Sequence, residues 1–186
     1  MDVWAYQLLA CACAFWGAVI IFRIAKPLSG GFGGIVAGLL YILYLSAFGV
    51  FAGQSEVFYI PLLLQMLLFA THIIVSDDLR KVLALSRWIM VLGGLCIQVK
   101  YTVLPQCIFF GLFCLWRIRV LGSSYSTILR LGLSFAFIGL LPTLAVGLFY
   151  LALGHFDAFF FANFSSIFMR GHLTGALKNQ YQLHVF

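Results

Sequence analysis

The feature that most constrains this chain is a series of apolar stretches of membrane-crossing length, separated by short segments that hold most of the charge. Residues 3–22 contain no charged side chain, and residues 32–51, 57–75 and 131–151 repeat the pattern. A helix of about 20 apolar residues crosses the hydrocarbon core of a bilayer. Lipid offers no partner to backbone polar groups, which favours helices. The sequence therefore predicts an all-α fold, a polytopic transmembrane helix bundle.

The amino-acid composition excludes an ordinary soluble domain. Hydrophobic residues make up 64% of the chain and charged residues only 9%, too few to build a polar exterior. The net charge of +6 comes from cations placed singly or in small groups between apolar stretches. A nucleic-acid site would instead show a basic face interleaved with polar and aromatic residues. We expect the bilayer as a partner and no nucleic acid.

Residues 88–116 are apolar but too long for one ordinary span, and Lys100 lies near their middle. A lysine at the centre of a membrane helix costs about 2.5–3.5 kcal/mol on insertion scales. A hairpin of two short helices, 88–99 and 101–116, would move Lys100 to a watery apex. We expect this hairpin, with residues 76–86 as the preceding loop and the apex within the outer half of the membrane. The bundle then has about six membrane helices.

The placement of lysine and arginine orients the predicted bundle. In this topology the inner loops hold eight cations and the outer side holds three, Lys100, Arg170 and Lys178. Cations concentrate on the cytoplasmic side of membrane proteins. The N-terminus and the loop after residue 151 are therefore expected on the extracytoplasmic side. All 186 residues are expected to form a single transmembrane domain.

Small residues predict one close helix contact. Gly34 and Gly38 stand four positions apart in the second apolar stretch, and such a spacing allows two helix backbones to approach. The five cysteines all lie within apolar stretches, where they are expected to act as small apolar residues rather than as disulfide partners.

The polar residues that could carry chemistry gather on the predicted outer side of the membrane. Ionisable groups at a membrane edge are candidates for functional sites. The candidates are Glu56 with Gln54 at the head of the third stretch, Lys100 with Gln98 and Tyr101 at the hairpin apex, His155 and Asp157 after the last stretch, and Arg170.

Each candidate also has a purely structural interpretation. Glu56 could cap its helix, because the helix dipole stabilises a carboxylate in the first turn. Lys100 could extend from the hairpin tip to the lipid headgroups. Its functional role would be to hold a phosphate. His155 and Asp157 fit ordinary loop residues, and Arg170 fits either a phosphate contact or an interfacial anchor.

Three segments resemble a known family. They are residues 33–64, in which a small-residue helix is followed by an acid at the head of the next helix, the glycine-rich segment 93–102 ending in Lys100-Tyr-Thr, and the segment 154–159. They are similar to the GT-C fold glycosyltransferases that use polyprenyl-phosphate sugars, in the branch of protein O-mannosyltransferases, aminoarabinose transferases and rhizobial lipopolysaccharide sugar transferases.

The resemblance implies inverting transfer of a sugar from a polyprenyl-phosphate donor to an extracytoplasmic lipid, glycan or protein, in a bacterial plasma membrane. It places Glu56 and Gln54 at the active-site cavity, with a divalent metal near Glu56 in some members. It places Lys100, with Gln98, Tyr101 and Arg170, near the carrier phosphate. The family's catalytic acid lies in an outer loop upstream of the part represented here. The chain is therefore expected to be an internal fragment, inactive alone, with no catalytic residue of its own.

Two other classes of function fit the same pattern. A polysaccharide polymerase, ligase or flippase-like transporter would also present outer-side cations to a polyprenyl-linked glycan. Such a transporter more often shows repeats and broken helices around a midplane site. A non-catalytic membrane subunit would carry no site, and its function would survive replacement of both Glu56 and Lys100.

Overall fold

The computed structural model describes residues 3–47 and 54–161, and all regular structure in these ranges is helical. Five of the described helices are long and apolar enough to cross a membrane. The chain is an integral membrane protein by this criterion, and the prediction of an all-α helix bundle is confirmed. The contacts divide the chain into two compact units, residues 1–142 and 143–186. Whether the whole chain forms one membrane domain stays a prediction.

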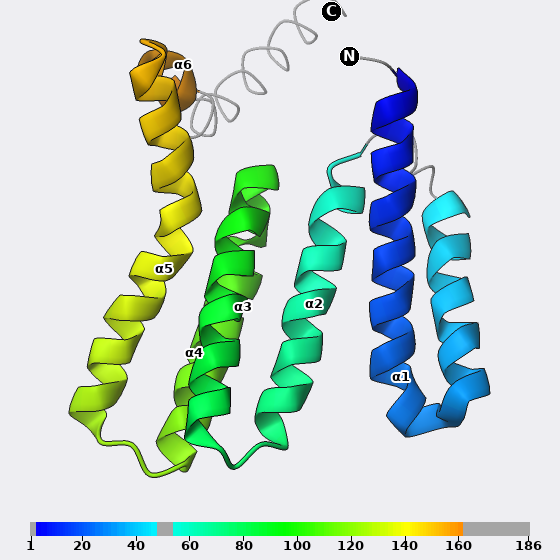
Figure 1. The fold of residues 1–186 in the computed structure, drawn as a ribbon, viewed down its shortest axis with the longest axis horizontal. Helices are drawn as coiled ribbons and strands as arrows, with labels where there is room; N and C mark the ends of the chain where they lie inside the picture. The colour runs from blue at the N-terminus through cyan, green and yellow to red at the C-terminus, as the bar shows by residue number, and fades with distance from the viewer. Residues whose placement is uncertain (1–2, 48–53, 162–186) are drawn as a thin grey trace, which may run out of the picture. The chain divides into compact units, whose positions relative to one another are not determined.

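The first helix, α1 (Val3–Ala47), contains two of the predicted spans. Its two arms meet at Gly30, whose φ of 73° lies in the left-handed region that glycine adopts without strain. The arms run side by side in opposite directions (Figure 1). The bend at Gly30 thus takes the place of an interhelical loop, and Arg23 and Lys26 shortly precede it in the chain.

The arms of α1 approach closely through the predicted small-residue face. A Cβ added to Gly38 would lie 3.1 Å from the backbone oxygen of Ala18, and one added to Gly34 would lie 2.9 Å from the Phe22 ring. Both distances are below ordinary contact, so a larger residue at either position would push the arms apart. The prediction of a close contact at Gly34 and Gly38 is confirmed.

The next three helices form an antiparallel series (Figure 1). They are α2 (Glu56–Ile74), α3 (Leu79–Val99) and α4 (Leu104–Val120), with a short 3-10 turn at Tyr101–Val103. The predicted hairpin with Lys100 at its apex is present. Its first arm, however, begins at Leu79 rather than at residue 88, so most of the predicted loop 76–86 is helical.

The loop prediction over 76–86 was wrong because charged residues there lie on one face of a helix. Asp78 caps the helix, accepting a hydrogen bond from the backbone N–H of Arg80 at 2.9 Å. Val82, Ser86 and Ile89 are fully buried at helical spacing. At about 1.5 Å per residue, the 21 residues of α3 cover roughly 31 Å, enough to cross the bilayer core. The reason for placing the apex inside the membrane is thereby removed.

Arg117 forms hydrogen bonds with the C-terminal end of α2. Its Nε donates to the backbone oxygen of Ile73 at 3.3 Å, and its Nη2 donates to the oxygen of Ser76 and to Asp77, both at 3.0 Å. The last carbonyls of a helix lack partners within the helix. Arg117 supplies N–H donors to the end of α2 from a neighbouring helix.

Glycine also ends α4. Gly122 has a φ of 93°, and its N–H donates to Arg119 while the N–H of Ser123 donates to Ile118. This pattern is a Schellman motif, which satisfies helix-terminal carbonyls at a left-handed residue. It leads directly into the last long helix, α5 (Tyr125–Ala152).

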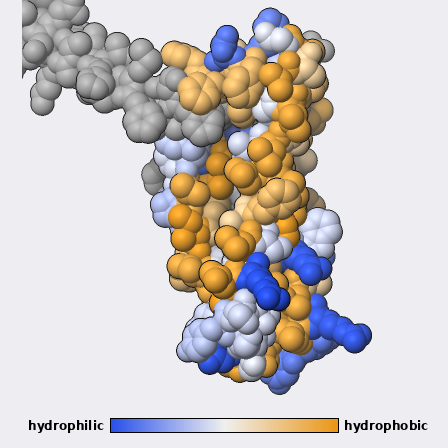
Figure 2. Space-filling model, turned by 90° about the vertical axis from the view of Figure 1, so that its left-hand side faces the viewer, coloured by the Kyte–Doolittle hydropathy of each residue, from blue (hydrophilic) through white to orange (hydrophobic). Residues whose placement is uncertain are grey.

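Much of the surface of the first unit is apolar. On α5 the side chains of Leu129, Leu133, Phe137 and Leu140 recur at helical spacing and are 49–70% exposed. Figure 2 shows one face on which hydrophobic side chains predominate, with most of the hydrophilic ones toward its lower end and a few at its upper end. Lipid is the solvent that such an exposed stripe requires.

Helix α3 meets its neighbours through two adjacent glycines. A Cβ on Gly94 would lie 2.3 Å from the backbone oxygen of Gly139 and 2.9 Å from Pro142, both on α5. A Cβ on Gly93 would make ordinary contacts of 3.4–3.5 Å with Cys107 of α4 and Met66 of α2. Gly94 therefore sets the distance between α3 and α5, whereas Gly93 does not restrict its neighbours.

This difference predicts opposite effects of two neighbouring substitutions. Gly94→Ala forces two backbones apart and should destabilise the protein by about 1–3 kcal/mol. Gly93→Ala should be neutral or stabilising by up to about 1 kcal/mol, because alanine favours helix. Thermal unfolding in detergent micelles measures both. Equal midpoints for the two variants would contradict the close approach at Gly94.

Candidate functional site

The candidate site lies at the apex of the α3–α4 hairpin, where Lys100 interrupts the helix. Lys100 has an extended backbone, with φ of −155° and ψ of 113°, and its N–H still donates to Cys96 at 2.9 Å. The chain then turns through Tyr101–Val103 into α4, which has a proline in its first turn. Proline is tolerated there because that N–H has no partner within the helix. The Lys100 side chain is thus held at a tight helix–helix junction.

Lys100 pairs with Glu56, which begins α2. The Lys100 ammonium donates a hydrogen bond to Glu56 Oε1 across a separation of 44 residues. The other carboxylate oxygen, Oε2, lies 3.3 Å from the Ser55 hydroxyl. Sequence reasoning named both charged residues as separate candidates, and the structure brings them together.

The pair is only partly shielded from its surroundings. The side chains of Lys100 and Glu56 are 34% and 29% exposed. An ion pair this accessible contributes a small but measurable amount to stability, because solvent competes for both charges. The same accessibility lets another charged group reach Lys100, which has three donors and uses one on Glu56.

The ring of Tyr59 also belongs to the candidate site, although the sequence analysis did not identify it. Tyr59 follows Glu56 by three residues, so it lies on the same face of α2. Its ring centroid is 5.7 Å from Lys100 Nζ, within the range of a cation–π contact. The Tyr59 backbone oxygen also accepts a contact from the Cys96 thiol at 3.8 Å. The spacing of three from Glu56 was the signal that could have identified it.

The charge of Lys100 is stabilised at this position. The hydrogen bond that Lys100 donates to Glu56 raises the pKa of Lys100 above its ordinary value, and the negative charge of Glu56 acts in the same direction. Lys100 is therefore cationic throughout the physiological range.

Three other predicted site residues lie near Glu56 or Lys100 in the sequence. Gln54 is exposed ahead of α2, and its backbone oxygen accepts from Val57 at 3.3 Å. Gln98 is half-buried near the end of α3, and Tyr101 is 41% exposed. These three residues flank the pair along the chain.

His155 and Asp157 belong to the second compact unit, residues 143–186. His155 precedes the short helix α6 (Phe156–Phe160), and its backbone oxygen accepts from Ala158 at 3.1 Å. Asp157 is exposed in the first turn of α6. Arg170 lies outside the described residues, so its predicted role stays a prediction.

The described residues around Glu56 do not form a divalent-metal site. Within residues 3–47 and 54–161, no group of three or more His, Cys, Asp or Glu side chains is suitably placed. The Lys100 ammonium already binds Glu56 Oε1, and the Ser55 hydroxyl lies at Oε2, so both carboxylate oxygens have protein partners. The possible divalent metal near Glu56 therefore does not fit this donor set, and no chemical step is assigned to one.

Comparison with protein-family models, with curated proteins and with solved structures found no match. The resemblance to GT-C glycosyltransferases therefore stays a prediction from short motifs.

The raised pKa of Lys100 predicts how stability varies at alkaline pH. A group whose pKa is higher in the folded state contributes stability that is complete below its unfolded pKa, about 10.4 for lysine. That contribution is lost as the pH rises through the folded pKa of Lys100. The difference in unfolding midpoint between wild type and Glu56→Gln should be constant from pH 8 to 10 and shrink above it. A constant difference up to pH 12 would argue against the pair.

Proposed function

We propose that this chain is the part of a membrane glycosyltransferase that binds the phosphate of a polyprenyl-phosphate sugar donor. The observation that carries the proposal is the partly exposed ion pair of Lys100 and Glu56 at the end of a lipid-embedded bundle. A cation held at a membrane edge is suited to a lipid-borne phosphate. The short family motifs identified in the sequence support the sugar-transfer part of the proposal.

In the proposed reaction, a hydroxyl of the acceptor attacks the anomeric carbon of the sugar. The bond between that carbon and the phosphate oxygen breaks, and the bonding electrons leave with the polyprenyl phosphate. Lys100 stabilises the charge that develops on the leaving phosphate. A carboxylate takes the acceptor proton. In the family pattern this base lies in an outer loop.

Glu56 has a positioning role in this scheme. With no donor bound, its carboxylate holds the Lys100 ammonium beside Tyr59. A bound phosphate would share or replace the carboxylate as the partner of Lys100, because both are anionic acceptors. Phosphate and Glu56 therefore compete for Lys100. This competition is expected if Lys100 binds the donor, and not if the ion pair only joins two helices.

The competition predicts opposite effects of two substitutions on donor binding. Lys100→Gln should weaken binding of a short-chain polyprenyl phosphate to the purified chain by about tenfold, as expected for loss of a charged hydrogen bond. Glu56→Gln should leave binding unchanged or strengthen it, because it removes the competing anion. Titration of tryptophan fluorescence in detergent measures both, with Lys100→Arg as the variant that keeps the charge.

The matching polyprenol, which lacks the phosphate, is the control ligand for tail binding and should not distinguish the variants. Equal weakening by Lys100→Gln and Glu56→Gln would show that the pair only joins two helices. The chain would then be better described as a non-catalytic membrane subunit.

The proposal also requires the ion pair to face the extracytoplasmic side of a bacterial plasma membrane. In a cysteine-free background, Thr102→Cys beside the apex should react with a membrane-impermeant maleimide on intact cells. Ser126→Cys, in the first turn of α5, should react only after the membrane is opened. Both positions are exposed, so accessibility within the protein does not bias the comparison. The reverse labelling pattern would exclude an extracytoplasmic donor site.

A further inference from the structure

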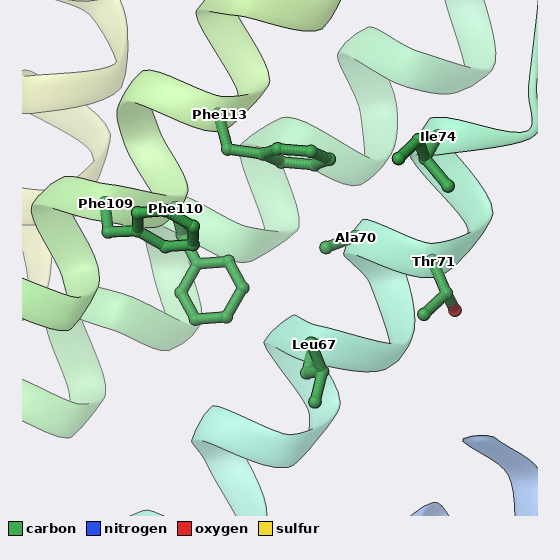
Figure 3. Close-up of a pocket in the computed structure, with 7 residues that line it drawn as sticks. All are labelled: Leu67, Ala70, Thr71, Ile74, Phe109, Phe110 and Phe113. Carbon is green, nitrogen blue, oxygen red and sulfur yellow. The ribbon is translucent and has the colours of Figure 1, made fainter. Parts of the chain in front are cut away.

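An apolar groove lies between α2 and α4, away from the candidate site. It has a volume of about 220 Å³. Phenylalanine side chains of α4 lie across from small and aliphatic residues of α2, with the methyl of Ala70 between them (Figure 3). The groove is lined by Leu67, Ala70, Thr71, Ile74, Phe109, Phe110 and Phe113.

The lining of the groove is suited to a hydrocarbon chain. Thr71 carries its only side-chain polar atom, and that hydroxyl donates to the backbone oxygen of Leu68 at 2.7 Å. No side-chain donor is therefore left to orient a polar ligand inside the groove. The volume accommodates a stretch of alkyl chain rather than a whole lipid molecule.

Arg117 lies at one end of this groove. It follows Phe113 by four residues on α4, and so extends from the same helix face. Its guanidinium contacts the backbone at Ile73 and Ser76, next to the lining residue Ile74. Three of its five N–H groups donate to these oxygens and to Asp77, which leaves the two on Nη1 without a partner among the described residues.

The end of the bundle that holds Arg117 is basic. In the described part of the chain, the cations of α3 and α4 at this end outnumber Asp77 and Asp78, the two acids beside them. The cations are Arg80, Lys81, Arg87, Arg117 and Arg119. A basic end next to an apolar groove complements a molecule with an anionic head and a hydrocarbon tail.

We propose that the α2–α4 groove binds an anionic phospholipid from the bilayer leaflet at the basic end, with one acyl chain between the helices and the phosphate at Arg117. This inference is independent of the proposed sugar transfer, because Lys100 and Glu56 lie at the other end of α2. A zwitterionic lipid would offer the same chain but less negative charge, so headgroup preference distinguishes recognition from simple solvation.

The experiment counts lipids bound to the purified full chain by native mass spectrometry, with phosphatidylglycerol and phosphatidylcholine of identical acyl chains as probes. Wild type should bind phosphatidylglycerol more tightly. Arg117→Gln should reduce that preference about fivefold, the effect expected for one basic residue near anionic lipid. Arg119→Gln is the matched control, because Arg119 instead contacts Ser123 and the Tyr125 ring.

A second pair of variants tests the groove itself without touching Arg117. Ala70→Leu fills the groove and should weaken binding of both lipids, whereas Ala84→Leu makes the same change at an exposed position of α3 and should not. If Ala70→Leu lowers the unfolding midpoint, Thr71→Leu fills the groove from a half-buried position and replaces it in the test.

Three results would overturn the proposal. They are equal affinity of wild type for the two lipids, equal loss of preference in Arg117→Gln and Arg119→Gln, and no loss of binding when the groove is filled. Unfolding midpoints of all variants, measured in the same detergent, show whether each loss concerns binding rather than folding.

Discussion

Both ends of α2 are held by cations of the α3–α4 hairpin. Lys100 meets the carboxylate that begins α2, and Arg117 meets the carbonyls that end it. Lipid leaves such groups without partners unless the protein supplies them. The hairpin therefore does more than cross the membrane twice, because it supplies a polar partner to each end of α2. The contact of α3 with α5 at Gly94 and the groove beside α4 belong to the same arrangement.

Hydropathy and charge placement were sufficient to predict much of this fold. Apolar length located the spans, and the cost of a mid-membrane lysine located the hairpin apex at Lys100. The same reasoning failed at residues 79–87, because charge density was taken as the sign of a loop. There the buried positions Val82 and Ser86 recur with helical spacing beneath the charged ones. In that segment the helical spacing of buried residues predicts the structure better than the density of charged residues does.

The pairing within the site could not be predicted from the sequence. Glu56 and Lys100 are 44 residues apart, and their contact depends on the register and rotation of three helices. That register follows from the packing of buried residues such as Met66, Ile89 and Cys114 between α2, α3 and α4, which no pairwise pattern in the sequence reveals. Tyr59 was within reach of prediction, since a spacing of three from Glu56 places it on the same helix face. The position of charged residues at the membrane edge identified Glu56 and Lys100 as candidates, but it did not show that they form an ion pair.

The separation of 44 residues recurs at both ends of α2, since it also divides Ile73 from Arg117. A ribosome adds about 5–20 residues per second, so each end of α2 waits roughly 2–9 s for its cation. During that interval α2 can already pack against α1, where Val57 contacts Ala10 and Leu45. The order of synthesis thus lets α2 pack against α1 before Lys100 and Arg117 can reach its two ends.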